Sequence, residues 1–219
     1  MAEHHPPDEL LLEYATGAAD PAVALMVASH ATLCPLCRER IAEHEALAGT
    51  LLRQPPATET PSPRDLVARI MAEAAETPPD LETDPRPATG DGVMPFPLQQ
   101  VVGPHADLPW KTLREGIDLV HFTIPGSNLI TRVLRLGEGF PVPRHGHRGL
   151  EMDLVLTGGI RDHTRKRDHH RGDVQVADTD LEHELEILPG ESCTVFTVTE
   201  GRVVPKGLRS RAVYAFLGF

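Results

Sequence analysis

A proline-rich stretch in the middle of the chain most constrains how this sequence can fold. Ten of the 21 prolines lie between Pro55 and Pro97, and six of them fall between Thr77 and Pro97, where apolar periodicity is almost absent. Proline fixes its own φ angle and donates no backbone hydrogen bond, so such a segment continues neither a helix nor a central strand. We therefore expect an extended linker over residues 77–97, between a domain of residues 1–76 and a domain of residues 98–219.

The residues before the linker carry helix signals. Asp20-Pro21 and Ser62-Pro63 each place a capping residue before a proline, which is typical of helix starts, and Gly17 marks a helix end. These signals predict four helices, over residues 8–15, 20–30, 35–53 and 62–76. The last helix lies between two proline clusters, so its apolar stripe must be buried on its own small domain or on a partner; the stripe consists of Leu66, Val67, Ile70, Met71 and Ala74.

The residues after the linker follow strand patterns. Short β-favouring runs alternate with turns that contain Gly or Pro. We expect no helix in residues 98–219, and this spacing predicts a sandwich or a small barrel. The fold class is therefore multidomain α + β, a small helical bundle followed by an all-β barrel. The predicted strands cover residues 117–124, 129–136, 151–157, 173–177, 183–188, 192–198 and 211–219.

The charge of the chain is concentrated before the barrel. Residues 1–97 carry 6 basic and 16 acidic side chains, a net of −10, out of −11 for the whole chain. Direct DNA binding is disfavoured, because phosphate contacts need clustered Lys and Arg. An acidic region of this kind attracts a basic protein surface or a cation, although a solvated helical surface would look the same.

The sequence also bears on location. Its longest uninterrupted apolar run, residues 22–28, is far below the ~18 residues of a membrane span. The N-terminus has neither the basic nor the apolar region of a secretory signal. We expect a cytoplasmic protein without a membrane segment, where cysteines near histidines more often bind metal than form disulfides.

A first group of potential metal ligands lies in the helical half. His30, Cys34 and Cys37 have the spacing H-x3-C-x2-C, which places an imidazole and a thiol one helical turn apart and a second thiol on the next helix. A structural zinc site needs four ligands, and His4 or His5 is available as the fourth. The alternative is that the cysteines are buried helix-end thiols and His30 is a capping residue. A metal would be useful here, because a helical domain of about 75 residues has a weak core.

These residues resemble a known family. The stretch from His4-His5 through Asp8-Glu9-Leu10-Leu11 and Tyr14-Ala15-Thr16-Gly17 to His30-x3-Cys34-x2-Cys37 is similar to the zinc-binding anti-sigma domain of ChrR-type transcriptional regulators. The resemblance implies a zinc site of His5, His30, Cys34 and Cys37. It also implies that this domain binds an extracytoplasmic-function sigma factor and blocks its access to RNA polymerase.

A second group of potential ligands lies in the β half. His145 and His147 stand at i and i+2, so on a strand they project to one face, and Glu151 follows four residues later. With the flanking glycines they resemble the first motif of cupin barrels, and His183 keeps the ligand position of the second motif. That second motif departs from the family pattern at Asp178, Asp180 and Ile187. Three imidazoles and a carboxylate suit zinc or another first-row divalent metal, whereas the alternative is a merely polar loop.

Other candidates in the β half look less specialised. His163, His169 and His170 lie among arginines and predict a solvated hairpin tip. Cys193 alternates with Val195 on a predicted strand, which favours a small core residue over a thiol that senses oxidants.

The two resemblances together predict a zinc-dependent anti-sigma factor, not an enzyme, whose cupin domain tunes the response to a signal. The family implies an oxidative signal such as singlet oxygen or an organic hydroperoxide. The alternative is a metal-dependent cupin enzyme, a dioxygenase or isomerase, with an accessory helical module. Because of the proline-rich linker, we expect the helical module to be physically independent of the barrel.

Overall fold

The helical half of the computed structural model has the four helices that the sequence predicts. The structure describes residues 2–52, 63–76, 91–207 and 210–211. Asp20 caps the second helix by accepting a hydrogen bond from the Ala22 backbone N–H at 2.8 Å, and Gly17 ends the first with a left-handed φ of 74°. The helices are α1 (Asp8–Thr16), α2 (Pro21–Leu33), α3 (Pro35–Leu52) and α4 (Pro63–Glu76).

None of the described helices is by itself long and apolar enough to cross a membrane. Helices α1 and α2 taken together have the required length and composition. They are, however, bent by 108° at the break between them.

In the part of the chain that the structure describes, the β half consists of two antiparallel sheets. One has six strands in the order β1-β2-β3-β10-β5-β8, and the other has five in the order β11-β4-β9-β6-β7. The expectation of a β domain built from short strands is confirmed, although most of the strand predicted over residues 211–219 lies outside the described residues. The strands are β1 (Lys111–Arg114), β2 (Ile117–Phe122), β3 (Ile130–Leu136), β4 (Pro141–Gly146), β5 (Glu151–Thr157), β6 (Gly159–Asp162), β7 (Arg167–His170), β8 (Val174–Ala177), β9 (Glu182–Ile187), β10 (Cys193–Thr199) and β11 (Val204–Pro205).

The expectation of no helix in residues 98–219 is wrong. Helix α5 (Phe96–Val102) begins at the end of the predicted linker, and a 3-10 turn, η1 (His105–Asp107), follows it. Pro97 stands in the first turn of α5, where a missing N–H removes no intrahelical hydrogen bond. Leu98 is fully buried against the core, so tertiary packing stabilises a helix too short to be recognised from its periodicity.

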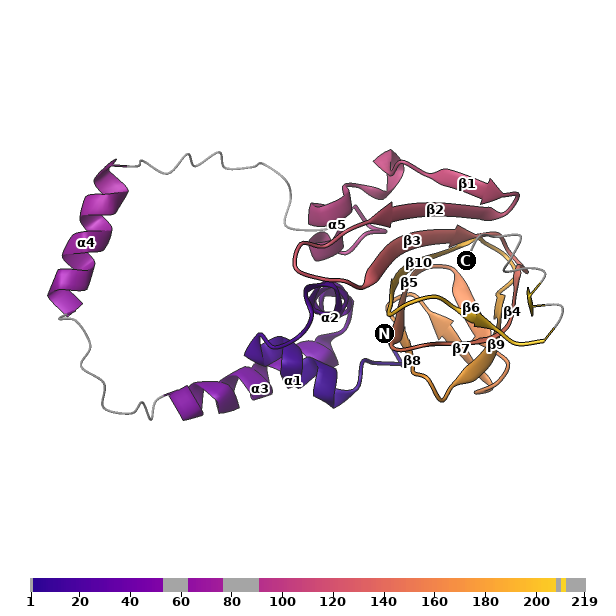
Figure 1. Cartoon of the computed structure of the whole chain (residues 1–219), viewed down its shortest axis with the longest axis horizontal. Helices are drawn as coiled ribbons and strands as arrows, with labels where there is room; N and C mark the ends of the chain where they lie inside the picture. The colour runs from indigo at the N-terminus through magenta and orange to yellow at the C-terminus, as the bar shows by residue number, and fades with distance from the viewer. Residues whose placement is uncertain (1, 53–62, 77–90, 208–209, 212–219) are drawn as a thin grey trace.

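The two halves of the chain share one hydrophobic core. Helix α2 lies on one face of the six-stranded sheet, in contact with β5, β10 and α5 (Figure 1). Met26 and Val27 of α2 are fully buried and belong to the same cluster as Met152 and Phe196 of the sheet. Each such side chain contributes about 1.5–3 kcal/mol through burial. The helical module is therefore not independent of the barrel, and that expectation is wrong.

The pleat of the six-stranded sheet places polar residues on its inner face. In β5, Met152 and Leu154 face the helices, whereas Glu151 and Asp153 line the space between the sheets. Successive side chains of a strand point to opposite faces, and here both faces are covered. One face of the six-stranded sheet is therefore apolar and packs against the helices. The opposite, inner face carries polar side chains that can bind a metal ion or a ligand.

Candidate metal centres

The structure brings the first group of predicted ligands together at the helix ends. His5 precedes α1, His30 lies in the last turn of α2, Cys34 joins α2 to α3, and Cys37 lies in the first turn of α3. Nδ1 of His5 lies 3.4 Å from Sγ of Cys34 and 3.5 Å from Sγ of Cys37. Nε2 of His30 lies 3.2 Å from Sγ of Cys37. A tetrahedral ion with sulfur at about 2.3 Å and nitrogen at about 2.0–2.1 Å holds the two donors about 3.6 Å apart, so these distances fit one ion.

Burial sets the protonation of these donors. It lowers the pKa of His30 to about 4, so the ring is neutral and can donate a lone pair. Burial, with the Cys34 thiol next to it, raises the pKa of Cys37 to about 12. A bare Cys37 is therefore a thiol at neutral pH, and a metal that binds it must displace a proton.

The barrel orients one of these donors. Nδ1 of His30 donates a hydrogen bond to the backbone carbonyl of Gly172, between β7 and β8, at 2.8 Å. This contact fixes the proton on Nδ1 and leaves the lone pair on Nε2, which faces Cys37. A turn of the barrel thus completes the surroundings of the N-terminal cluster.

The second group of predicted ligands also comes together, at one end of the barrel. His145 of β4 stands directly opposite His183 of β9, and their Nε2 atoms are 2.9 Å apart. Nε2 of His147 lies 3.1 Å from that of His183, and the Glu151 carboxylate lies 3.7 Å from the same atom. Two nitrogens on one ion are about 2.9–3.4 Å apart for bond angles between 90° and 109°, so this cluster fits a single ion as well.

The protonation of the second cluster suits a cation. The Nδ1–H of His145 donates to the Pro143 carbonyl at 2.9 Å, so its Nε2 presents a lone pair to His183. Burial lowers the pKa of all three rings, to about 4 for His145 and His183 and about 3 for His147. Burial also raises the pKa of Glu151 to about 7, against the opposing effect of Arg132. Neutral rings that converge with their lone pairs form a cation-binding arrangement.

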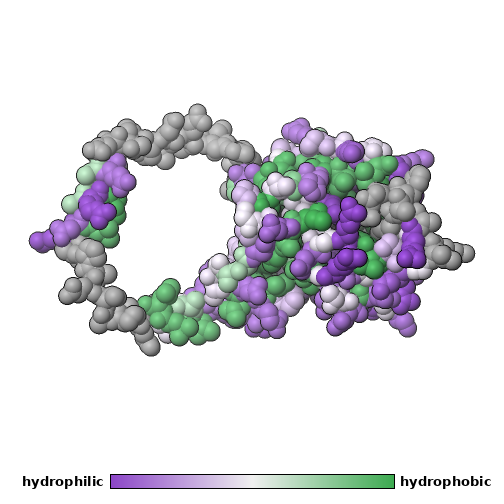
Figure 2. Space-filling model, in the orientation of Figure 1, coloured by the Kyte–Doolittle hydropathy of each residue, from purple (hydrophilic) through white to green (hydrophobic). Residues whose placement is uncertain are grey.

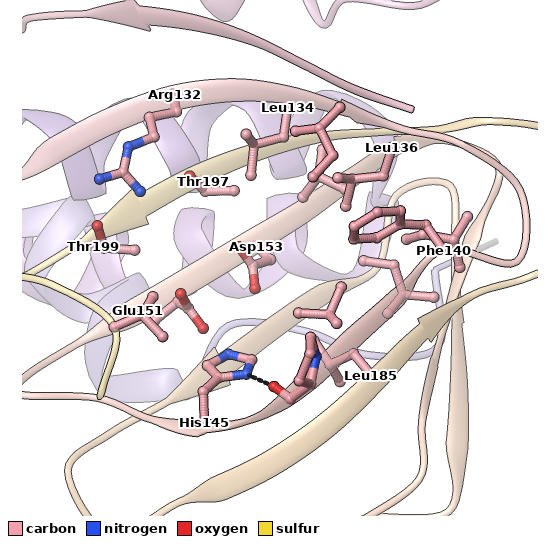
Figure 3. Close-up of a pocket in the computed structure, with 17 residues that line it drawn as sticks. Arg132, Leu134, Leu136, Phe140, His145, Glu151, Asp153, Leu185, Thr197 and Thr199 are labelled. Atoms are coloured by element: carbon pink, nitrogen blue, oxygen red, sulfur yellow. Dashed lines mark hydrogen bonds between the residues drawn. The ribbon is translucent and has the colours of Figure 1, made fainter. Parts of the chain in front are cut away.

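A cavity of about 100 Å³ adjoins the second cluster. His145 and Glu151 lie at one end of it, next to Arg132, Asp153 and two threonines, and an apolar wall with Leu134, Leu136, Phe140 and Leu185 forms the other end (Figure 3). The cavity has room for a few water molecules or a small ligand. A water molecule or small ligand in this cavity can therefore act as the fifth or sixth ligand of an ion held by the cluster.

His169 and Cys193 are both buried, which corrects the prediction for His169 and agrees with that for Cys193. His169, which the sequence places at a solvated hairpin tip, is fully buried in β7, where the ring of His4 from the N-terminal segment lies against it. The other two histidines of that group, His163 and His170, are exposed as expected. Cys193 is fully buried in the core between the sheets, as predicted. Burial raises its pKa to about 12.

Comparison with known proteins places the chain in a family. The anti-sigma-E factor ChrR of Cereibacter sphaeroides is 35% identical over 200 residues, which are 90% of this chain and 89% of that protein. This chain belongs to the ChrR family. The family model for the ChrR cupin-like domain matches residues 98–202, which include every predicted ligand of the barrel.

A solved structure extends the similarity to the whole architecture. It is the crystal structure of Rhodobacter sphaeroides SigE in complex with the anti-sigma ChrR, and the match has a TM-score of 0.75 and 33% identity. The match covers 91% of this chain and all of the other. The relatives carry the name of a regulator, which favours the expected regulatory role over that of a cupin enzyme.

Proposed function

We propose that this chain is a cytoplasmic, zinc-dependent anti-sigma factor that sequesters an extracytoplasmic-function sigma factor. In this proposal an oxidative signal, such as singlet oxygen or an organic hydroperoxide, causes its release. The similarity to ChrR along nearly the full chain, together with the solved complex of ChrR with SigE, supports the choice of partner.

The distribution of exposed apolar side chains is the observation that carries this proposal. Among the described residues, every exposed large apolar side chain except Val101 lies on α1, α3 or α4. Leu51 and Leu52 at the end of α3 are 68% and 80% exposed, and Ile70 and Met71 of α4 are 55% and 66% exposed. Figure 2 shows hydrophobic surface at the end of α3 and on α4. Several exposed apolar side chains on one helix are typical of protein interfaces, so α3 and α4 are our candidate sigma-binding surfaces.

The charge of the same region agrees with a protein partner. The net of −10 in residues 1–97 favours a basic surface on the sigma factor. Opposite charges raise the rate of association and select the partner, while the apolar side chains of α3 and α4 supply most of the binding energy.

We assign zinc to the N-terminal centre, with His5, His30, Cys34 and Cys37 as ligands. Two thiolates and two imidazoles are a usual zinc set, and the donor distances suit a closed tetrahedral site. In the barrel we assign zinc or another first-row divalent metal to His145, His147, Glu151 and His183. The adjoining cavity leaves room there for a ligand that changes with the signal.

The structure offers a route from the barrel to the helices. The Gly172 carbonyl orients the proposed zinc ligand His30, and α2 packs on β5, the strand that carries Glu151. A signal shifts the equilibrium between bound and free sigma factor only if it interacts differently with the two states. A change at the barrel metal can meet this condition through these contacts.

Co-purification tests the proposal. The tagged chain is expressed in its own cell, and the proteins that elute with it are identified and quantified. We expect a sigma factor in a 1:1 ratio with the wild-type chain, and much less with Ile70→Asp; Val101→Asp, an exposed apolar residue on α5, is the matched control and should retain it. Elution of the wild-type chain without any sigma factor contradicts the proposal.

A further inference from the structure

The ring of His169 is buried without a hydrogen-bonding partner. It is fully inaccessible to solvent, and among the described residues neither Nδ1 nor Nε2 has a hydrogen-bond partner. Burial of a polar ring normally requires that its nitrogens be satisfied. The ring of His4 lies against it, with the two ring centroids 4.5 Å apart.

Asp173 completes a cluster with these two histidines. One potential ligand atom from each of His4, His169 and Asp173 lies within 4.8 Å of the other two. The Asp173 carboxylate is held in place by backbone N–H groups of Glu3 and His4, at 2.6 and 3.0 Å, and by that of His170 at 2.7 Å. A carboxylate oxygen with these contacts still has lone pairs to offer.

The geometry points to a third metal site, formed by His4, His169 and Asp173, for a first-row divalent cation such as Zn²⁺. Two imidazoles and a carboxylate are a common ligand set for such ions, with the remaining positions left to water. A cation would accept a lone pair from the His169 ring, which lacks a partner otherwise. His4 lies on the N-terminal segment and is only partly buried, so its side chain is less confined than that of His169.

The proposed site lies where the N-terminal segment meets the barrel. His4 precedes the zinc ligand His5, His169 belongs to β7, and Asp173 lies in the turn before β8. The backbone of this junction is already paired, since the Val174 N–H donates to the His4 carbonyl at 3.0 Å. A cation here would fasten the segment that carries His5 to the barrel. The inference does not depend on the sigma factor, and its test needs none.

Metal content measures the site directly. The full-length chain is saturated with ZnCl2, desalted and analysed for zinc by elemental mass spectrometry. We expect three zinc ions per chain for the wild type and two for His4→Gln and His169→Gln. The matched control is His170→Gln, which changes the exposed neighbour on the same strand and should retain three.

The variants also distinguish loss of the site from loss of the fold. His4→Gln changes a partly exposed terminal residue and should keep the thermal unfolding profile of the zinc-free wild type, so it decides the matter even if His169→Gln folds poorly. Two zinc ions in the wild type would overturn the inference, as would three in a folded His4→Gln variant.

Discussion

The two centres that we assign to metals differ in how much of the fold depends on them. Around the N-terminal centre only α2 buries a long face, and it does so against the sheet; α1 buries only Leu11, and α3 buries only Cys37 and Ile41. The barrel centre sits between strands that have a core of their own, with Ile117, Val155 and Ile187 among its members. We infer that the first ion holds its domain together, whereas the second occupies a site that the barrel forms without it.

This difference between the two centres predicts that loss of the N-terminal ligands has the largest effect on folding and on sigma binding. In the double variant Cys34→Ala/Cys37→Ala we expect loss of one zinc ion, loss of helicity by circular dichroism and at least about a 100-fold weaker sigma affinity, because binding of a structural zinc is coupled to folding, worth about 10–16 kcal/mol in zinc-finger peptides. Cys193→Ala is the control, since it removes a buried thiol of the barrel and leaves all zinc bound. A metal-free double variant that binds the sigma factor at full affinity would refute the role given to this centre.

A second test concerns the core that joins the two regions. Met26→Ala should lower the free energy of unfolding by about 2–5 kcal/mol, because it empties a fully buried position between α2 and the sheet. We expect helicity and the fluorescence of Trp110, the single tryptophan, to change in one transition. Leu47→Ala, at a position 60% exposed, should cost less than about 0.5 kcal/mol. Separate transitions, with only the helical one shifted, would mean that the regions fold independently.

Loss of the barrel ligands should have a different effect on binding and on response. We expect His145→Ala/Glu151→Gln to lose one metal ion, to keep sigma affinity within about twofold of the wild type, and to lose release on oxidant exposure, because the helices do not need this ion to fold. A sigma-dependent reporter, read before and after photosensitised oxidation, measures both properties. If release is unchanged, the sensor lies in the N-terminal centre; if basal binding collapses, the two centres do not differ as we claim.

The smallest effect concerns Cys193. Burial raises its pKa from 9.0 to about 12, so at neutral pH it has about 10³-fold less thiolate than an ordinary cysteine. Because the thiolate is the reactive form, alkylation of Cys193 in the zinc-loaded chain should be slow and should accelerate about tenfold per pH unit up to at least pH 10. Mass spectrometry of the alkylated protein follows this rate. Fast labelling at pH 7, or loss of the oxidant response in Cys193→Ala, would make this thiol a sensor.

Local sequence signals predicted most of the fold but not how its parts meet. Asp20 caps the start of α2, Gly17 ends α1, and α4 begins at Pro63. Such signals act within a few residues, so the helices are predictable from the sequence. The spacing of His30, Cys34 and Cys37 is likewise local. The packing of α2 on β5 and β10 does not follow from local signals, because an apolar helix face does not indicate which surface will cover it.

The wrong predictions have a common origin in contacts between residues that are far apart in the sequence. The charged sequence neighbours of His169 predict a solvated position, yet His4, 165 residues away in the sequence, lies against its buried ring. Helix α5 is not predictable from its sequence, because seven residues with a proline carry little periodicity and the helix packs against α2. The contact of His30 with the Gly172 carbonyl joins a side chain to backbone 142 residues away, and no sequence pattern encodes such a pair.

Hydrogen–deuterium exchange on the complex tests the central claim most directly. The chain is compared alone and bound to the sigma factor that co-purifies with it. Our account predicts that binding slows exchange in α3 and α4, where exposed Leu51, Leu52, Ile70 and Met71 lie, and leaves the barrel strands β4 and β9 unchanged. Protection confined to the barrel, with α3 and α4 exchanging as in the free chain, would contradict it.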